Sequence, residues 1–167
     1  MPESICTRAA HEAGLTPSDL ERLVGVARSG ADAGGQELMR HYGRLSSIKN
    51  NGRSGDLVTN ADLAAERIIL KLLAELTPDI AVLAEESGAA GQQDGLRWCV
   101  DPLDGTTNFA HGYPFFATSI GLSLGQQPIL GAIAVPFLKE MYWGAPEIGA
   151  FCNESPLQVS SCDRLED

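Results

Sequence analysis

The stretch that most constrains the fold is residues 98–109, WCVDPLDGTTNF. Its first three residues end an apolar, strand-like run, and the run stops at Asp101. Pro102 follows, and because proline has no backbone N–H group and a restricted φ, it holds the next turn open. The short polar residues from Thr106 onward are typical of the start of a helix. The sequence therefore predicts a strand that is aimed at a polar site and a helix that leaves it.

The turn after this strand carries two acidic residues, Asp101 and Asp104, three positions apart. Two carboxylates in one turn repel each other unless a cation or a proton lies between them. Mg²⁺ suits such a pair, since it prefers oxygen ligands and commonly works with the oxygens of a substrate phosphate. Gly105 and Thr106 would offer a close backbone, N–H groups and a hydroxyl to that phosphate. The alternative is an ordinary surface turn, because Asp, Pro and Gly are common turn residues.

Composition excludes several classes of protein. With 167 residues, 44% of them hydrophobic, the chain can form one domain with a real core. A net charge of −10 argues against nucleic-acid binding, which requires a basic face. The four cysteines are widely spaced, which argues against a zinc knuckle and favours a reducing, cytoplasmic compartment. We find no secretory signal or membrane span, so we expect a soluble protein without nucleic-acid or membrane partners.

The first third of the chain predicts a long helix. Residues 1–17 show no clear period and predict a flexible leader. The run Ser-Asp-Leu-Glu at 18–21 has the pattern of a capping box, and the apolar residues after it predict a helix from about residue 18 to 42. Three glycines weaken this helix unless they allow close packing, so we expect an imperfect middle. They are Gly30, Gly34 and Gly35.

A second helix is predicted after a polar segment. Residues 49–55, KNNGRSG, predict a loop or a hairpin turn. Asn60 is the expected N-cap of a helix whose apolar residues run from Leu63 to Leu76 and which ends near Thr77. Asp62 falls in its first turn, where the helix dipole favours a carboxylate, so this residue needs no functional explanation on its own.

The remaining patterns predict strands. The apolar run at 80–84 predicts a short strand that ends at Glu85 and Glu86, and residues 89–96 predict a mobile connection. Because strand side chains alternate in direction, one glutamate would point toward the site and its neighbour away, unless both are solvated turn residues. Four further strands, the first two of them a hairpin, are predicted at 116–124, 129–135, 140–143 and 149–153.

Four segments also form a longer pattern. They are WCVDPLDGTTNFAHGYPFFATSIGL at 98–122, DLVTNAD at 56–62, AEESG at 84–88 and GAFCNESPLQVS at 149–160. This pattern resembles the signature of the inositol monophosphatase family, which consists of Mg²⁺-dependent, lithium-sensitive phosphatases, and it covers about residues 20 to 160. The residues that favour this branch over bisphosphatase and nucleotide-phosphatase relatives are Leu103, Thr107, Phe109, Ala110 and His111.

The resemblance implies a set of site residues. The metal ligands would be Glu85, Asp101, Asp104 and the backbone carbonyl of Leu103, with Glu86 as a bystander. The residues that orient and activate a water for attack on phosphorus would be Asp62, Thr106 and Glu85. The substrate contacts would come from Glu85, Leu103, Asp104, Gly105 and Thr106. The implied reaction is Mg²⁺-dependent hydrolysis of a small phosphate monoester, in the first place myo-inositol 1-phosphate, by a homodimer in the full-length form.

The resemblance also implies a fold and a division of the chain. The fold would be α+β, the N-terminal half of the layered αβαβα sandwich of these phosphatases, with two long helices on a mainly antiparallel sheet. Family members continue well beyond the position of Asp167 into a second half with a further metal-binding aspartate. We therefore expect residues 18–160 to form the N-terminal domain and residues 161–167 to begin a truncated C-terminal region. A second metal would then bind weakly, and exposed apolar surface would favour self-association.

Three alternatives stay open. A haloacid-dehalogenase-type phosphatase also pairs acids before Gly-Thr, but its aspartates are two apart, whereas Asp101 and Asp104 are three apart. The chain would otherwise be a non-catalytic, metal-binding remnant. The third alternative is a related phosphatase for another substrate, such as fructose 1,6-bisphosphate, a phosphoadenosine nucleotide or histidinol phosphate.

Overall fold

The structure, a computed structural model, describes residues 4–44, 48–50, 57–90, 95–162 and 164. Its helices are α1 (Ile5–Glu12), α2 (Pro17–His41), α3 (Asn60–Leu76) and α4 (Thr106–Ala110). Its strands are β1 (Ile48–Asn50), β2 (Leu57–Thr59), β3 (Ala81–Ala84), β4 (Gly88–Ala90), β5 (Leu96–Asp104), β6 (Ala117–Leu124), β7 (Gln127–Val135), β8 (Glu140–Ala145), β9 (Gly149–Cys152) and β10 (Ser155–Pro156).

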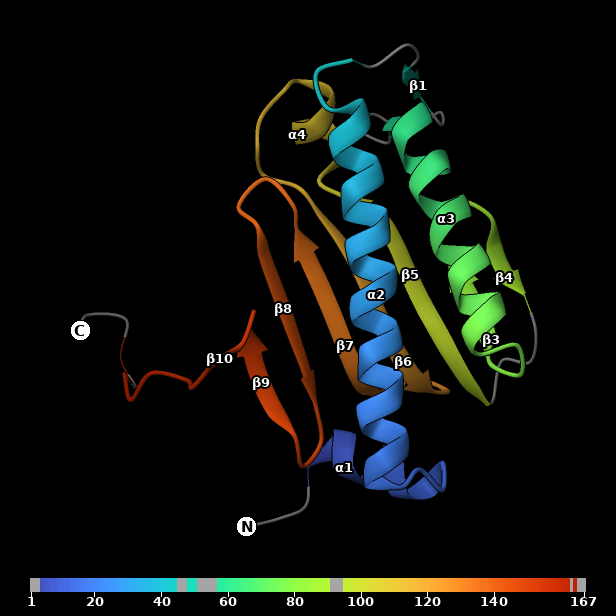
Figure 1. Ribbon diagram of the computed structural model, residues 1–167, viewed down its shortest axis with the longest axis vertical. Helices are drawn as coiled ribbons and strands as arrows, with labels where there is room; N and C mark the ends of the chain where they lie inside the picture. Colours follow the sequence, from blue (N-terminus) through green and yellow to red (C-terminus); the bar gives the residue numbers. More distant parts are fainter. Residues whose placement is uncertain (1–3, 45–47, 51–56, 91–94, 163, 165–167) are drawn as a thin grey trace.

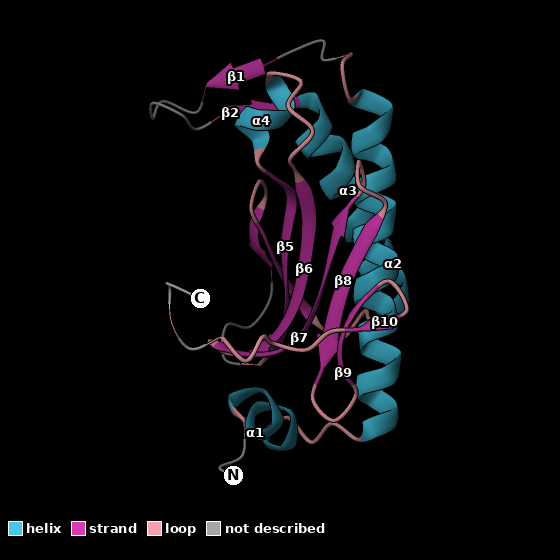
Figure 2. Cartoon of the chain, turned by 90° about the vertical axis from the view of Figure 1, so that its left-hand side faces the viewer, coloured by secondary structure: helices cyan, strands magenta, loops and turns pink. Residues whose placement is uncertain are grey.

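The strands from β3 to β10 form one sheet in the order β10-β9-β8-β7-β6-β5-β3-β4. Neighbouring strands are antiparallel except β3 and β5, which run parallel. The helices α2 and α3 lie side by side across one face of this sheet (Figure 1), and the side view shows both on the same side (Figure 2). The predicted α+β arrangement, two long helices on a mainly antiparallel sheet, is confirmed.

Helix α2 begins one residue before the predicted start because its cap lies further upstream. Thr16 is the N-cap, and its hydroxyl accepts a hydrogen bond from the backbone N–H of Asp19 at 3.2 Å. The carboxylate of Asp19 accepts in return from the backbone N–H of Thr16 at 3.0 Å. This reciprocal pair is a capping box, and Pro17 occupies the first turn, where no intrahelical donor is needed. The expected box at 18–21 is therefore wrong, although the helix itself is confirmed.

The expected imperfect middle of α2 is also wrong, because the glycines there serve as packing positions. The helix runs unbroken from Pro17 to His41, and all three glycines are buried. A Cβ atom on Gly30 would lie 2.6 Å from Cδ1 of Ile120, and one on Gly35 would lie 3.3 Å from Cβ of Pro136. Only glycine allows α2 to approach the sheet this closely, and the packing gained offsets the poor helix propensity.

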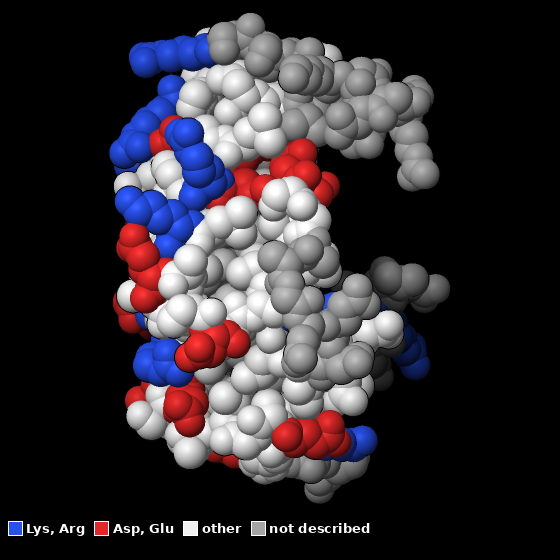
Figure 3. All heavy atoms as spheres, turned by 90° about the vertical axis from the view of Figure 1, so that its right-hand side faces the viewer, with Lys and Arg blue, Asp and Glu red and all other residues white. Residues whose placement is uncertain are grey.

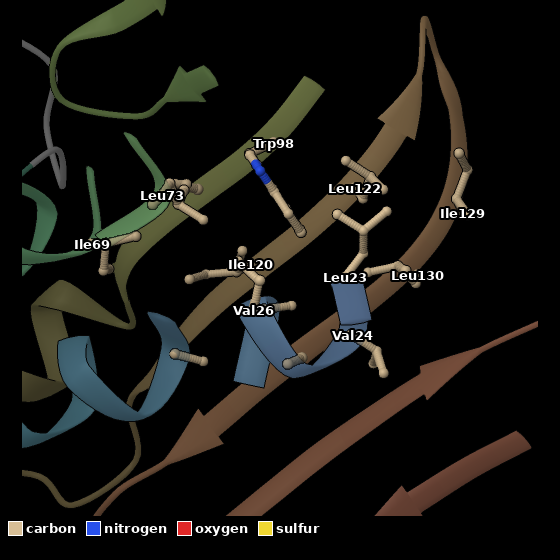
Figure 4. Close-up of a cluster of buried hydrophobic side chains, with 14 of the residues drawn as sticks. Leu23, Val24, Val26, Ile69, Leu73, Trp98, Ile120, Leu122, Ile129 and Leu130 are labelled. Atoms are coloured by element: carbon tan, nitrogen blue, oxygen red, sulfur yellow. The ribbon is translucent and has the colours of Figure 1, made fainter. Parts of the chain in front are cut away.

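The main core lies between the two long helices and the middle of the sheet. Figure 4 shows side chains of α2, α3, β5, β6 and β7 pointing toward one another. Trp98 of β5 is fully buried, and its indole N–H donates to the hydroxyl of Thr77 at 2.9 Å. Thr77 is the C-cap of α3, so this bond ties the end of the helix to the centre of the sheet. Each large apolar side chain buried here contributes about 1.5–3 kcal/mol.

A smaller cluster lies behind the turn between β5 and α4. Its buried members are Leu38, Ala61, Ala65, Leu103, Phe109 and Phe116. The rings of Phe109 and Phe116 meet edge to face with 4.8 Å between their centroids, a favourable aromatic geometry. These residues come from α2, α3, β5, α4 and the segment before β6, so the cluster packs these elements together behind the turn.

The expected lack of regular structure before Pro17 is wrong for the described residues. Helix α1 forms there, capped by the hydroxyl of Ser4, which accepts from the backbone N–H of Thr7 at 3.0 Å. Ala9 and Ala10 are buried in the main core, where α1 packs beside β7. An eight-residue helix with an alanine contact face carries little periodic signal. The division into domains stays a prediction.

The two predicted loops are only partly described. Most of the segment at 49–55 and residues 91–94 lie outside the described residues. The flanking segments β1 and β2 pair antiparallel, and β4 adds a strand that was not predicted at the edge of the sheet. Over the described residues, we find no helix of the length and apolarity needed to cross a membrane.

Candidate active site

The turn at the end of β5 is held by hydrogen bonds to its own backbone. The pairing with β6 shifts register between Asp101 and Asp104, so the chain bulges at Pro102 and Leu103, both of which are buried. The backbone N–H of Leu103 donates to Oδ1 of Asp101 at 3.1 Å. The hydroxyl of Thr118 on β6 donates to the carbonyl of Pro102 at 3.0 Å. A plain surface turn would not be buried or anchored in this way, so that alternative does not fit.

The parallel pairing of β3 and β5 places two carboxyl groups side by side. The backbone N–H of Glu85 donates to the carbonyl of Val100 at 3.1 Å, which extends the ladder past Ala84 and sets Glu85 next to Asp101. Burial, a hydrogen bond with the Glu85 side chain and the negative charges of Glu85 and Asp104 raise the pKa of Asp101 to about 7. Two carboxyl groups this close repel each other unless a proton or a cation lies between them.

A second pair of site residues joins α3 to α4. Asp62 is buried, and its Oδ2 accepts hydrogen bonds from the backbone N–H of Thr59, at 2.9 Å, and from the Thr59 hydroxyl. Its Oδ1 faces the hydroxyl of Thr106 at 3.4 Å, and that hydroxyl donates to the carbonyl of Leu103 at 2.9 Å. Burial raises the pKa of Asp62, although the bonds from Thr59 and Thr106 oppose the shift. Asp62 is therefore a buried proton acceptor in contact with the turn.

The cap of α3 lies one residue earlier than expected. Thr59, not Asn60, is the N-cap, and it forms a capping box with Asp62. The predicted helix and its end near Thr77 are confirmed. Asp62 lies in the first turn of α3, where the helix dipole favours a carboxylate, as expected. The dipole does not explain why one carboxylate oxygen points at Thr106 on another element.

A model of the inositol monophosphatase family matches residues 19–167, which include every candidate site residue. The chain belongs to the inositol monophosphatase family. It is 44% identical over 153 residues to the inositol-1-monophosphatase of Synechocystis sp., covering 91% of this chain and 53% of that protein. It is 37% identical over 150 residues to a fructose-1,6-bisphosphatase/inositol-1-monophosphatase of Aquifex aeolicus, covering 89% of this chain and 56% of that protein.

Solved structures of the family share the fold. The extragenic suppressor protein suhB of Bartonella henselae matches with a TM-score of 0.79 and 40% identity, over 86% of this chain and 56% of that chain. An inositol monophosphatase from Anabaena (Nostoc) sp. matches with a TM-score of 0.75 and 36% identity, over 86% of this chain and 52% of that chain. The chain thus spans about half the length of the family members it matches, and the predicted family fold is confirmed over that span.

The donor atoms of the family's predicted metal site suit a hard cation. Carboxylate and carbonyl oxygens are the ligands that Mg²⁺ prefers, and the repulsion around Asp101 is what a cation would relieve. The carbonyl oxygen of Leu103 accepts a hydrogen bond from the Thr106 hydroxyl, and because a carbonyl oxygen has two lone pairs it can bind a metal as well. Among the described residues, no three His, Cys, Asp or Glu side chains converge closely enough to hold an ion. The side chains of Glu85 and Asp101 interact, and both Glu85 and Asp104 are exposed.

Gly105 makes the passage from the turn into α4 possible. It is the N-cap of α4 with φ of +85°, a conformation that glycine adopts without strain. A Cβ atom here would lie 2.9 Å from the carbonyl oxygen of Phe115. The close approach brings the start of α4, with Thr106, over the turn. Figure 3 shows Asp and Glu atoms gathered where this side of the surface is hollowed.

One buried acid near the site was not predicted. Glu66 lies on α3 four residues after Asp62, is only 4% exposed, and accepts a hydrogen bond from the backbone N–H of Glu86 at 2.9 Å. The signal in the sequence was its spacing, since Glu66 shares a helix face with Asp62 and with the buried Ile69. By contrast, Leu63, the first apolar residue of the predicted helix, is 51% exposed.

Proposed function

We propose that this chain carries the site of a Mg²⁺-dependent phosphate monoester hydrolase and that myo-inositol 1-phosphate is its substrate. The observation that carries the proposal is the parallel pairing of β3 and β5, which sets Glu85 next to Asp101. Burial, together with the neighbouring Glu85, raises the pKa of Asp101 to about 7. Structural carboxylates are normally separated or paired with cations. Two of them held together without a cation from the described residues between them attract a divalent ion.

Four groups would hold the metal, and one of them, the backbone carbonyl of Leu103, belongs to a buried residue. They are the carboxylates of Glu85, Asp101 and Asp104 and the backbone carbonyl of Leu103. When bound, Mg²⁺ would neutralise charge on the phosphate oxygens and lower the pKa of a nearby water. No serine or cysteine nucleophile is needed for hydrolysis by that route.

Asp62 and Thr106 would handle the proton of the attacking water. The Thr106 hydroxyl can turn its hydrogen from the Leu103 carbonyl to Oδ1 of Asp62, which leaves its oxygen lone pairs free to accept from a water. As the water oxygen bonds to phosphorus and the ester P–O bond breaks, the water's proton would pass through Thr106 to Asp62. The raised pKa of Asp62 suits it to accept that proton. The leaving oxygen would take a proton from the solvent, so that an alcohol and phosphate are released.

The phosphate itself would lie against the turn and the start of α4. Glu85, through the metal, and the backbone of Leu103, Asp104, Gly105 and Thr106 are the proposed contacts. The name of the Synechocystis relative supports inositol 1-phosphate as the substrate. The name of the Aquifex relative makes fructose 1,6-bisphosphate a second candidate. Lithium inhibition, a cytoplasmic location and a homodimer of the full-length form stay predictions.

Phosphate release from myo-inositol 1-phosphate by the 167-residue chain, with Mg²⁺ or with EDTA, tests the proposal. We expect phosphate release to depend on Mg²⁺. In Asp101→Asn the rate should fall at least about 100-fold, because the variant removes one negative charge from the proposed metal site. Asp79→Asn is the matched control, since Asp79 is exposed after α3 and outside the proposed site. Equal rates in the two variants, or release that EDTA does not affect, would contradict the proposal. A folded chain that binds Mg²⁺ but releases no phosphate would favour the non-catalytic alternative.

A further inference from the structure

Glu66 is a buried acid for which the reaction described above has no use. It lies on α3 one turn beyond Asp62, and the next residues on the same face, Ile69 and Leu73, are fully buried in the main core. Burying a carboxyl group costs free energy unless polar partners compensate for the lost water. An apolar residue would serve the packing of α3 better, so the burial of Glu66 calls for another explanation.

The hydrogen bond that Glu66 accepts lies next to a proposed metal ligand. Its Oε2 accepts from the backbone N–H of Glu86 at 2.9 Å. On the other side, the backbone N–H of Glu85 donates to the carbonyl of Val100 at 3.1 Å. The two peptide groups that flank Glu85 are thus tied to different elements, one to β5 and one to α3. Fixing both peptide planes restricts φ and ψ of Glu85 and so the direction of its side chain.

Strand β3 cannot supply this restraint alone. Its last residue paired with β5 is Ala84, and beyond that pair the described ladder continues only with the bond from the Glu85 N–H to Val100. The residues from Glu85 to Ser87 form a turn rather than a strand. If the backbone of this turn shifted by one residue, Glu85 and Glu86 would exchange places. Glu86 would then face Asp101 and Glu85 would face away. The bond from Glu86 to Glu66 is compatible with only one of these arrangements.

We propose that Glu66 is a positioning residue, which aims Glu85 at Asp101 by holding the backbone N–H of Glu86. The proposal rests on the proposed function, because it assumes that Glu85 is a metal ligand. Groups that orient metal ligands in this way affect metal affinity although they never touch the metal. Glu66 therefore sets the affinity of the site, whereas Asp62, one turn earlier, contacts Thr106.

Mn²⁺ binding to the full 167-residue chain, followed by the electron paramagnetic resonance of the free ion, tests this role. Glu66→Met keeps the length and removes the acceptor, so we expect Mn²⁺ to bind about 10–100-fold more weakly. Glu66→Gln keeps an oxygen that can accept from Glu86, so it should bind within about 3-fold of the wild type. Rescue by glutamine separates the hydrogen bond from the charge. Glu85→Gln, which alters the ligand itself, is the positive control.

The outcomes separate the two proposals. If Glu85→Gln weakens Mn²⁺ binding and Glu66→Met does not, the positioning role is refuted and the metal site stands. If wild type and Glu85→Gln bind Mn²⁺ equally, the metal site is refuted and the role of Glu66 with it. A glutamine variant as weak as Glu66→Met also refutes the hydrogen-bond mechanism. Should Glu66→Met fail to fold, Glu66→Asp decides, because its shorter side chain cannot reach Glu86 and wild-type binding would overturn the proposal.

Discussion

Replacing Gly34 of α2 by alanine would show how closely this helix packs on the elements that carry the site. The added Cβ atom would lie 2.8 Å from Cδ1 of Ile69 on α3 and 2.8 Å from Cγ2 of Thr118 on β6. Real Cβ contacts are not this short, so a neighbour has to move. Ile69 can change rotamer, but the Thr118 hydroxyl is bonded to the carbonyl of Pro102. The disturbance would therefore reach the turn of the candidate site.

Two opposing terms set the size of this effect. Alanine is better than glycine in a helix by about 1 kcal/mol. Overpacking a filled core costs about 1–3 kcal/mol. Because one of the two clashes at Gly34 is with an anchored side chain, the cost lies in the upper part of this range. We expect a net loss of about 1–2 kcal/mol, which lowers the melting temperature of a chain of this size by about 2–8 °C.

Thermal unfolding followed by circular dichroism would measure the loss, and Gly25→Ala is the matched control. Gly25 lies on the same helix, but a Cβ atom there would have no neighbour within 4 Å. Only the propensity term remains, so Gly25→Ala should stabilise the protein by about 0.5–1 kcal/mol. If Gly34→Ala raised the melting temperature as Gly25→Ala does, the glycines of α2 would not be packing positions and the reasoning would be refuted.

Two further predictions concern the turn. The pKa of Asp101 is raised from its ordinary 3.8 to about 7 in the folded chain. Its contribution to the free energy of unfolding is therefore fully present below about pH 4 and is lost as the pH rises through about 7. Because Asp101 is half-buried, we expect the free energy of unfolding, measured with urea in the absence of Mg²⁺, to fall by about 1–2 kcal/mol over this range. Asp101→Asn should not show this fall. The same pH dependence of the free energy of unfolding in both proteins would contradict the prediction. Gly105→Ala should cost about 1–3 kcal/mol in the same assay, since it forces a side chain into φ of +85° against the carbonyl of Phe115, and wild-type stability would show that α4 can move away.

Local sequence signals were sufficient for the long elements. The helices α2 and α3, the β6–β7 hairpin and the strand β5 could all be predicted, because periodicity and turn residues act over short distances. The predicted end of β5 at Asp101 is wrong, because the strand continues past a bulge to Asp104. The pairing of Glu85 with Asp101 could be expected only from the family resemblance. The reason is that the parallel register of β3 and β5 depends on contacts far apart in the sequence.

The features that were missed depend on tertiary contacts. Helix α1 is stabilised by the burial of two alanines, which carry almost no periodic signal. Gly34 looks like a helix breaker until Ile69 and Thr118 are known to pack against it. Glu66 looks like a surface acid until the backbone of Glu86 is placed beside it. In each case, packing overrides the local preference.

The most direct test of the central claim, that Glu85 and Asp101 form a divalent-metal site, is an anomalous difference map from crystals of the chain grown with Mn²⁺. We expect a peak between these two carboxylates and the carbonyl of Leu103, with metal–oxygen distances of about 2.0–2.3 Å. The carboxyl groups would then bind the ion instead of each other, and any proton bound there would be released. A map with no peak at this position, while Glu85 and Asp101 remain hydrogen-bonded to each other, would contradict the account.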